Sequence, residues 1–197
     1  YESEKIDLVI QDGNSGQVLR KEALHSYGLY QLEFADLNQD GAVDMLIKAH
    51  SGGTAGYFDF MVYSFKNNNL TSIIDHLEND LGYVFMDGFM AEVFSEQAQK
   101  SYLIELDQQR KEDYIAGGFY DHDGRLLDSG MGGLKFPDFD ITYVKPLEKY
   151  GLKVSHSLVG PSYNADIIAT VEILYVFNSG KWTIVNMTVS DEVGLVK

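Results

Sequence analysis

Residues 34–47 read Phe34-Ala35-Asp36-Leu37-Asn38-Gln39-Asp40-Gly41-Ala42-Val43-Asp44-Met45-Leu46-Ile47. Oxygen-bearing side chains recur at every second position of this stretch, and a run of Val, Met, Leu and Ile surrounds its last acidic residue. In a tightly turning loop, that spacing directs successive side chains toward one centre. We therefore expect residues 36–44 to form a loop between two β-strands, at residues 29–34 and 44–49.

The spacing fits calcium, a hard cation that takes about six to eight oxygen ligands. Gly41 stands at the sixth position, where the backbone must turn sharply. The seventh position supplies a backbone carbonyl, so its side chain is free to vary. The predicted metal ligands are therefore Asp36, Asn38, Asp40, Ala42 (through its carbonyl) and Asp44.

The twelfth position separates two kinds of calcium loop. An EF-hand places a bidentate glutamate there, on the first turn of a helix. This sequence has Ile47 in a β-rich run, so we expect a strand–loop–strand site. The alternative is a solvated turn of Asp, Asn and Gly that binds no metal.

The loop resembles the Asp-x-Asp-x-Asp-Gly-x-x-Asp loops of FG-GAP and VCBS-type repeats, with Asn38 in place of the second Asp. The wider arrangement is similar to a group of exported Firmicutes proteins. In that group such a loop is followed by a Ser-Gly-Gly segment, here Ser51-Gly52-Gly53, and the chain ends in a Gly-Lys-Trp hairpin, here Gly180-Lys181-Trp182. The resemblance implies calcium binding and an extracellular or cell-envelope location, and it supplies no catalytic residues.

Charge and composition restrict the partners. The chain of 197 residues has 30 acidic and 15 basic residues, a net charge of −15. This charge repels nucleic-acid phosphates, so we expect no nucleic-acid partner. Without cysteine, disulfides and zinc–thiolate sites are excluded. No apolar run approaches the roughly 18 residues of a membrane span, so we expect no membrane insertion of this segment.

The rest of the chain predicts a mainly β protein with antiparallel sheets and one or two short helices. Runs rich in β-branched and aromatic residues predict further strands at residues 5–10, 17–24, 58–65, 70–74, 90–94 and 102–106. Residues 108–116 predict a helix, with Asp107 as its N-cap and Gly117 as its stop.

The two halves of the chain show similar strings. Leu46-Ile47-Lys48-Ala49-His50 resembles Leu152-Lys153-Val154-Ser155-His156, and each is followed by a strand–turn–strand pattern. We therefore expect one domain over residues 1–197 with an internal repeat at residues 29–75 and 141–190. A less regular segment, residues 107–140, joins the two copies. The copies would be divergent and propeller-like, but the chain is too short for a closed propeller.

Signatures of catalysis, such as a serine nucleophile elbow or a nucleotide-binding fingerprint, are absent from the sequence. We therefore expect a calcium-stabilised, non-enzymatic binding or interaction module of the bacterial cell envelope, with an envelope protein or glycan as its partner. The alternative is a metal-dependent hydrolase or carbohydrate-active enzyme, in which Asp36 and its neighbours hold a catalytic metal. A third option places the C-terminal hairpin in a nuclear-transport-factor-like cone, but the sequence lacks the long N-terminal helices of such a domain.

Overall fold

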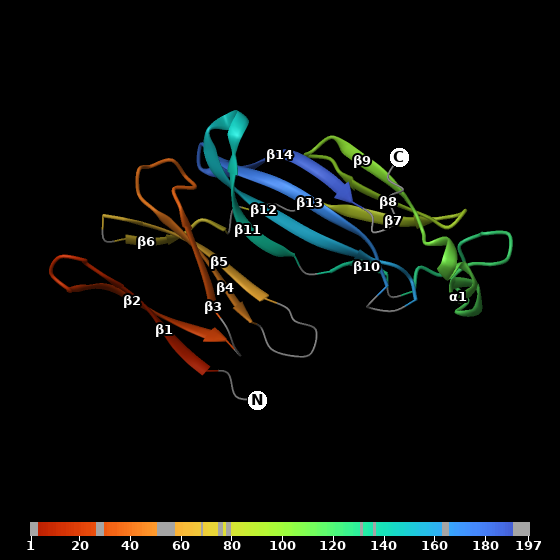
Figure 1. The fold of residues 1–197 in the computed structure, drawn as a ribbon, viewed down its shortest axis with the longest axis horizontal. Helices are drawn as coiled ribbons and strands as arrows, with labels where there is room; N and C mark the ends of the chain where they lie inside the picture. The colour runs from red at the N-terminus through yellow and green to blue at the C-terminus, as the bar shows by residue number, and fades with distance from the viewer. Residues whose placement is uncertain are drawn as a thin grey trace. The chain divides into compact units, whose positions relative to one another are not determined.

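The computed structural model describes residues 4–26, 30–50, 58–67, 69–74, 77, 80–130, 132–135, 137–162 and 166–190. Within these residues the chain is mainly β, with antiparallel sheets and one short α-helix (Figure 1), which confirms the predicted fold class. The chain divides into two compact units. Unit 1 comprises Tyr1–Leu77, Phe139–Leu152 and Val176–Thr183, and unit 2 comprises Glu78–Asp138, Lys153–Tyr175 and Ile184–Lys197.

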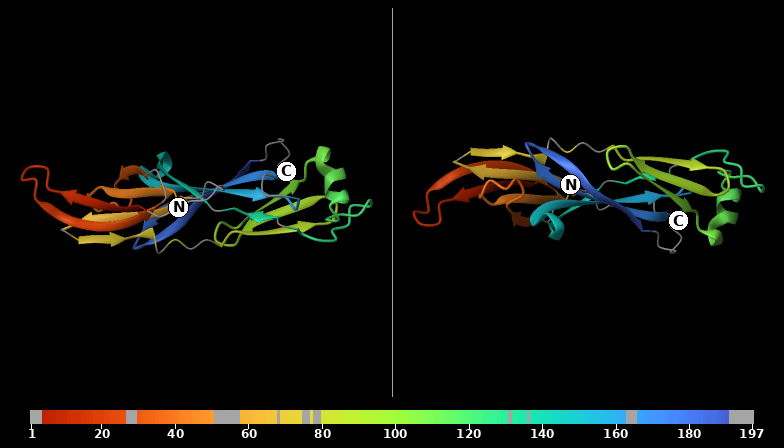
Figure 2. Two further views of the ribbon diagram at one scale, coloured as in Figure 1. Left: turned by 90° about the horizontal axis from the view of Figure 1, so that it is seen from below. Right: turned by 90° about the horizontal axis from the view of Figure 1, so that it is seen from above.

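Unit 1 begins with an antiparallel hairpin of β1 (Glu4–Gln11) and β2 (Val18–Ser26). A four-stranded antiparallel sheet follows, in which neighbouring strands are also consecutive in the chain. Its strands are β3 (Tyr30–Ala35), β4 (Asp44–His50), β5 (Phe58–Lys66) and β6 (Asn69–Ser72). Figure 2 shows the β1–β2 hairpin running alongside this sheet.

Alternation along β4 divides its side chains between the two faces of the sheet. Met45 and Ile47 are buried on one face, where Leu8 of β1 packs against them together with Met61 and Tyr63 of β5. Burial of apolar side chains from two separate strand groups holds the hairpin against the sheet. This packing fixes β4, and therefore the end of the acidic loop that leads into it.

The opposite face of β4 carries a buried cation. Lys48 is 5% exposed, and its Nζ lies 2.6 Å from Oδ1 of Asp140 and 3.3 Å from Oε1 of Glu33. The second carboxylate oxygen of Glu33 accepts the Ile141 amide at 2.8 Å. These bonds attach the segment Phe139–Leu152 to the sheet of unit 1, and all three charges have opposite-charge partners.

Unit 2 contains a three-stranded antiparallel sheet of β7 (Gly82–Met86), β8 (Met90–Ser95) and β9 (Lys100–Glu105). A 3-10 turn, η2 (Gln108–Arg110), then leads into the helix α1 (Lys111–Ala116). Asp107 accepts the Gln109 amide at 2.8 Å, and Gly117 is the C-cap. The predicted helix and both of its caps are therefore confirmed, although its first turn is 3-10 rather than α.

The remaining strands form a five-stranded sheet in the order β10-β12-β13-β14, with β11 also paired to β12. Their bounds are β10 (Gly133–Leu134), β11 (Asp138–Val144), β12 (Lys149–Val159), β13 (Ile167–Asn178) and β14 (Lys181–Ser190), with a 3-10 turn, η3 (Lys145–Leu147), before β12. Both segments of the predicted repeat contain four consecutive paired strands, but antiparallel meanders commonly share this order. The internal repeat and the single domain therefore stay predictions.

Candidate metal centre

The acidic loop connects β3 to β4, as the sequence predicts. Ala35 and Asp44 are paired in the β3–β4 register, so the two strands hold the ends of the loop together. Gly41 has a φ of 83°, in the left-handed region that favours glycine, and Gln39 has a φ of 58°. The chain thus turns sharply at the predicted glycine, between strands rather than before a helix.

Asp36 and Asp40 organise the loop backbone. Oδ1 of Asp36 accepts the Asp40 amide at 3.1 Å, and Oδ2 accepts the Gly41 amide at 3.0 Å. Oδ1 of Asp40 accepts the Ala42 amide at 2.8 Å. This hydrogen bond has the largest influence on the pKa of the Asp40 carboxyl and holds it below the ordinary value. These two carboxylates therefore stabilise the turn without a bound ion.

Asp44 has a different environment, because it is fully buried at the start of β4. Its Oδ2 accepts the amides of Leu37 at 2.8 Å and Asn38 at 3.1 Å. Among the described residues, no hydrogen bond of ordinary geometry reaches its Oδ1. Burial raises the pKa of this carboxyl, and the nearby Ser64 hydroxyl and the two amides oppose that rise. A buried acceptor without a partner costs about 1–3 kcal/mol, so this oxygen marks the place where a cation would stabilise the loop most.

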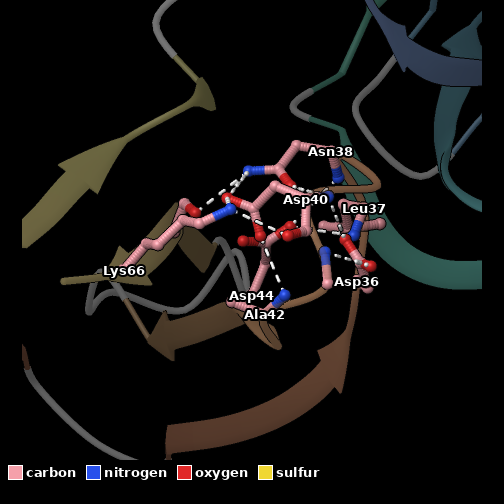
Figure 3. A network of polar contacts seen from close by, with 9 residues as sticks. Asp36, Leu37, Asn38, Asp40, Ala42, Asp44 and Lys66 are labelled. Carbon is pink, nitrogen blue, oxygen red and sulfur yellow. Dashed lines mark hydrogen bonds and ion pairs between the residues drawn. The ribbon is translucent and has the colours of Figure 1, made fainter.

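Strand β5 supplies two side chains that the sequence reasoning missed. Ser64 is paired with Asp44 in the β4–β5 register, and its Oγ accepts a hydrogen bond from Nδ2 of Asn38 at 3.0 Å. Two residues later, Lys66 donates to the Asp40 carbonyl at 2.8 Å and lies 3.4 Å from Oδ2 of Asp40. Figure 3 shows Lys66 reaching the acidic side chains from the side of the loop. Alternation along β5 could have placed both on one face, but only if its register with Asp44 were known.

The five predicted ligands lie on one loop. Among the described residues, no group of three or more His, Cys, Asp and Glu side chains is placed to hold a metal ion. The carboxylates of Asp36 and Asp40 accept loop amides instead. The donor chemistry nevertheless fits a hard cation, because the loop offers three carboxylates, the Asn38 side-chain oxygen, the Ala42 carbonyl and one unpartnered buried oxygen.

Asp121-His122-Asp123-Gly124, in unit 2, is a second acidic stretch and shows what an ordinary turn does. Oδ1 of Asp121 accepts the amides of Asp123 at 3.0 Å and Arg125 at 2.8 Å. The isolated bridge between Tyr120 and Leu126 closes the turn. The stretch is therefore the hairpin turn expected from an Asp-Gly pair. The Ser51-Gly52-Gly53 segment lies outside the described residues.

A buried aspartate in unit 2, Asp166, forms a polar cluster that no sequence motif indicated. Its Oδ1 accepts the Arg110 guanidinium and the Tyr114 hydroxyl, the latter at 3.1 Å, and its Oδ2 accepts the Ser162 hydroxyl at 2.9 Å. A Cβ at Gly160 would lie 2.3 Å from this Oδ2, so glycine leaves the room that the carboxylate needs. The cluster ties the α1 region to the β12–β13 connection, and both carboxylate oxygens have partners.

Comparisons with known proteins bear on the part of the chain that follows the acidic loop. No match was found among curated proteins, and none among solved structures. The described residues contain no helix long and apolar enough to cross a membrane. The family model described as the YybI C-terminal domain matches residues 79–190, a range that begins after the acidic loop. Because this match covers more than half of the 197 residues, the chain belongs to the family of the YybI C-terminal domain.

Proposed function

We propose that this protein is a calcium-stabilised, non-enzymatic binding or interaction module of the bacterial cell envelope. The observation that carries the calcium part is the fully buried Asp44, whose Oδ1 has no hydrogen-bond partner among the described residues. Calcium would be held by Asp36, Asn38, Asp40, the Ala42 carbonyl and Asp44. It would neutralise the carboxylates, which now accept hydrogen bonds from the amides of the loop.

The location and the class of partner rest on charge and on the resemblance of the loop to FG-GAP and VCBS-type repeats. Extracellular calcium modules bind the ion with dissociation constants of about 10⁻⁴–10⁻³ M. A net charge of −15 disfavours nucleic acids and anionic lipid surfaces. These features favour an envelope protein or glycan as the partner of an exported module.

Calcium titration followed by thermal unfolding tests the proposal. At ten times its dissociation constant, a ligand of the folded state adds about 1.4 kcal/mol of stability. For a chain of this length that corresponds to a rise in Tm of about 3–6 °C. We expect this rise with millimolar calcium, relative to the same protein in chelator.

Asp40→Ala should abolish the rise, because it removes a predicted ligand. Asp121→Ala is the matched control, since it removes an aspartate that organises a turn in unit 2 and should leave the rise intact. Each titration needs sodium chloride at matched ionic strength and a magnesium series, because calcium also screens the excess negative charge without binding a site. Equal shifts with calcium and with sodium chloride would refute the proposed site.

A further inference from the structure

We propose that Lys66 is a built-in cation of the acidic loop, which holds Asp40 when calcium is absent and must be displaced for calcium to bind. This inference rests on the proposed function, because it concerns the same loop. Lys66 would lower the calcium affinity of the site without being one of its ligands.

The contacts of Lys66 are specific to one residue of the loop. Its Nζ donates to the Asp40 carbonyl at 2.8 Å and also pairs with Oδ2 of Asp40 at 3.4 Å (Figure 3). The other oxygen of that carboxylate, Oδ1, already accepts the Ala42 amide. Oδ2 also accepts the side-chain amide of Asn38 at 3.4 Å, so a calcium ion at this oxygen would share it with the ammonium group of Lys66.

The contact that can break most easily is the one with Lys66. Its side chain is 48% exposed, so the ammonium group can move into water, whereas the Ala42 amide is fixed by the turn. An exposed ion pair of this kind contributes little to stability. A divalent ion bound to the Asp40 carboxylate would also repel an ammonium group that shares it. Calcium and Lys66 therefore compete for Asp40.

Charge explains why such a competitor is useful. Without an ion the loop carries the three carboxylates of Asp36, Asp40 and Asp44, and Lys66 offsets one of these charges. The lysine thus reduces the repulsion between these carboxylates when calcium is scarce. Its presence also weakens calcium binding, so the site fills only at high calcium concentration, as a module outside the cell requires.

Lys66→Met tests this competition by two independent measurements. In chelator, the variant should melt about 1–4 °C below the wild type, because it loses the tethered cation. In a calcium titration followed by isothermal calorimetry, its dissociation constant should be roughly two- to fivefold lower than that of the wild type. Lys66→Arg keeps the charge and should retain an affinity close to that of the wild type.

Lys181→Met is the matched control, because it removes the same charge from an exposed lysine at the start of β14. It should change neither the Tm in chelator nor the calcium affinity by the amounts expected for Lys66→Met. If Lys181→Met strengthens calcium binding equally, the effect is one of net charge and the inference is wrong. If the wild type binds calcium and Lys66→Met binds it no more tightly, the inference is wrong and the proposed function stands.

The same experiment separates the two proposals in the remaining cases. If the wild type binds no calcium at 10 mM, a concentration of about ten times the upper limit for such modules, and Lys66→Met does, the proposed function is wrong. The inference then stands, because the lysine has replaced the ion. If neither protein binds calcium, both proposals are overturned.

Discussion

Two aspartates, one in each unit, are fully buried and yet have opposite environments. Asp166 has side-chain donors on both oxygens, and one of them is the charged guanidinium of Arg110. Asp44 has the neutral amides of Leu37 and Asn38 on one oxygen and the neutral Ser64 hydroxyl nearby, and its Oδ1 has no hydrogen bond of ordinary geometry from the described residues. The same side chain at the same burial is therefore neutralised in one unit and not in the other.

The difference shows where a ligand is expected. Moving a carboxylate out of water costs several kcal/mol unless opposite charge and hydrogen bonds replace the lost solvent. For Asp166 the protein itself supplies that charge through Arg110. The lysine that reaches the acidic loop, Lys66, contacts Asp40 rather than Asp44. We infer that the charge of Asp44 is left for an external cation, so the two aspartates should respond differently to mutation and to calcium.

Asp166→Ala should give the largest effect. It removes the acceptor of Arg110 and of the buried Tyr114 hydroxyl, and breaking a buried ion pair in this way typically costs about 3–5 kcal/mol. Because Arg110 keeps a third of its side chain in solvent, we expect a loss of about 3 kcal/mol, measured by urea unfolding. The loss should be the same in chelator and in millimolar calcium.

A milder variant keeps this prediction testable if Asp166→Ala does not fold. Tyr114→Phe removes one hydroxyl and its hydrogen bond to Asp166, and should cost about 1–2 kcal/mol, again independently of calcium. A loss that calcium restores in either variant would contradict the comparison, because it would place the metal-linked carboxylate in unit 2.

Asp44→Asn should give a smaller effect whose sign depends on calcium. The folded pKa of Asp44 lies above its unfolded value near 3.8, so the penalty for its charge is absent in acid and complete once the pH exceeds the folded pKa. At pH 7 in chelator, the substitution removes that charge and should raise the unfolding free energy. In calcium at ten times the dissociation constant, the variant should lack the gain of about 1.4 kcal/mol seen in the wild type.

Asp36→Asn is a matched comparison, since it removes a charge from the same loop at a partly exposed position whose oxygens both have amide donors. It should weaken calcium binding without raising stability in chelator. If Asp44→Asn destabilises the protein in chelator by more than Asp36→Asn does, Asp44 is not an uncompensated charge.

The parts of the fold that sequence reasoning anticipated are those decided by local chemistry. Runs rich in β-forming residues predicted β3 and β4 on either side of the loop, and Asp107 and Gly117 marked the ends of the helix segment. Strand β7 was not predicted. Its first residue, Gly82, is paired with Phe94, whose ring lies where a Cβ would be. This contact depends on the pairing of β7 with β8, which the local sequence does not indicate.

The candidate site shows the same limit. The spacing of oxygen-bearing residues identified the loop and the turn at Gly41, because both depend on neighbouring residues. It did not reveal Lys66, which is 26 residues from Asp40, or the cluster in which Arg110 reaches Asp166 over 56 residues. Whether a buried carboxylate is already neutralised depends on such distant partners, so the sequence alone treats Asp44 and Asp166 alike.

His156 provides the smallest test and a third arrangement for a buried ionisable group. It is 3% exposed, and its Nδ1 lies 3.3 Å from the Lys135 carbonyl. Burial lowers the pKa of this histidine below 6.5, which favours its neutral form at pH 7. Between the folded and the unfolded pKa the unfolded chain binds more protons, so stability falls as the pH decreases below about 6.5.

We expect this histidine to account for part of the loss of stability between pH 7 and pH 5, which His156→Gln should remove and His122→Gln, at an exposed histidine, should not. The direction is opposite to that of Asp44, whose penalty grows as the pH rises. Urea unfolding of the three proteins in chelator over this range separates the two contributions. An unchanged pH dependence in His156→Gln would mean that the histidine binds protons equally in the folded and the unfolded chain. In that case burial alone would not determine how an ionisable group in this chain is neutralised.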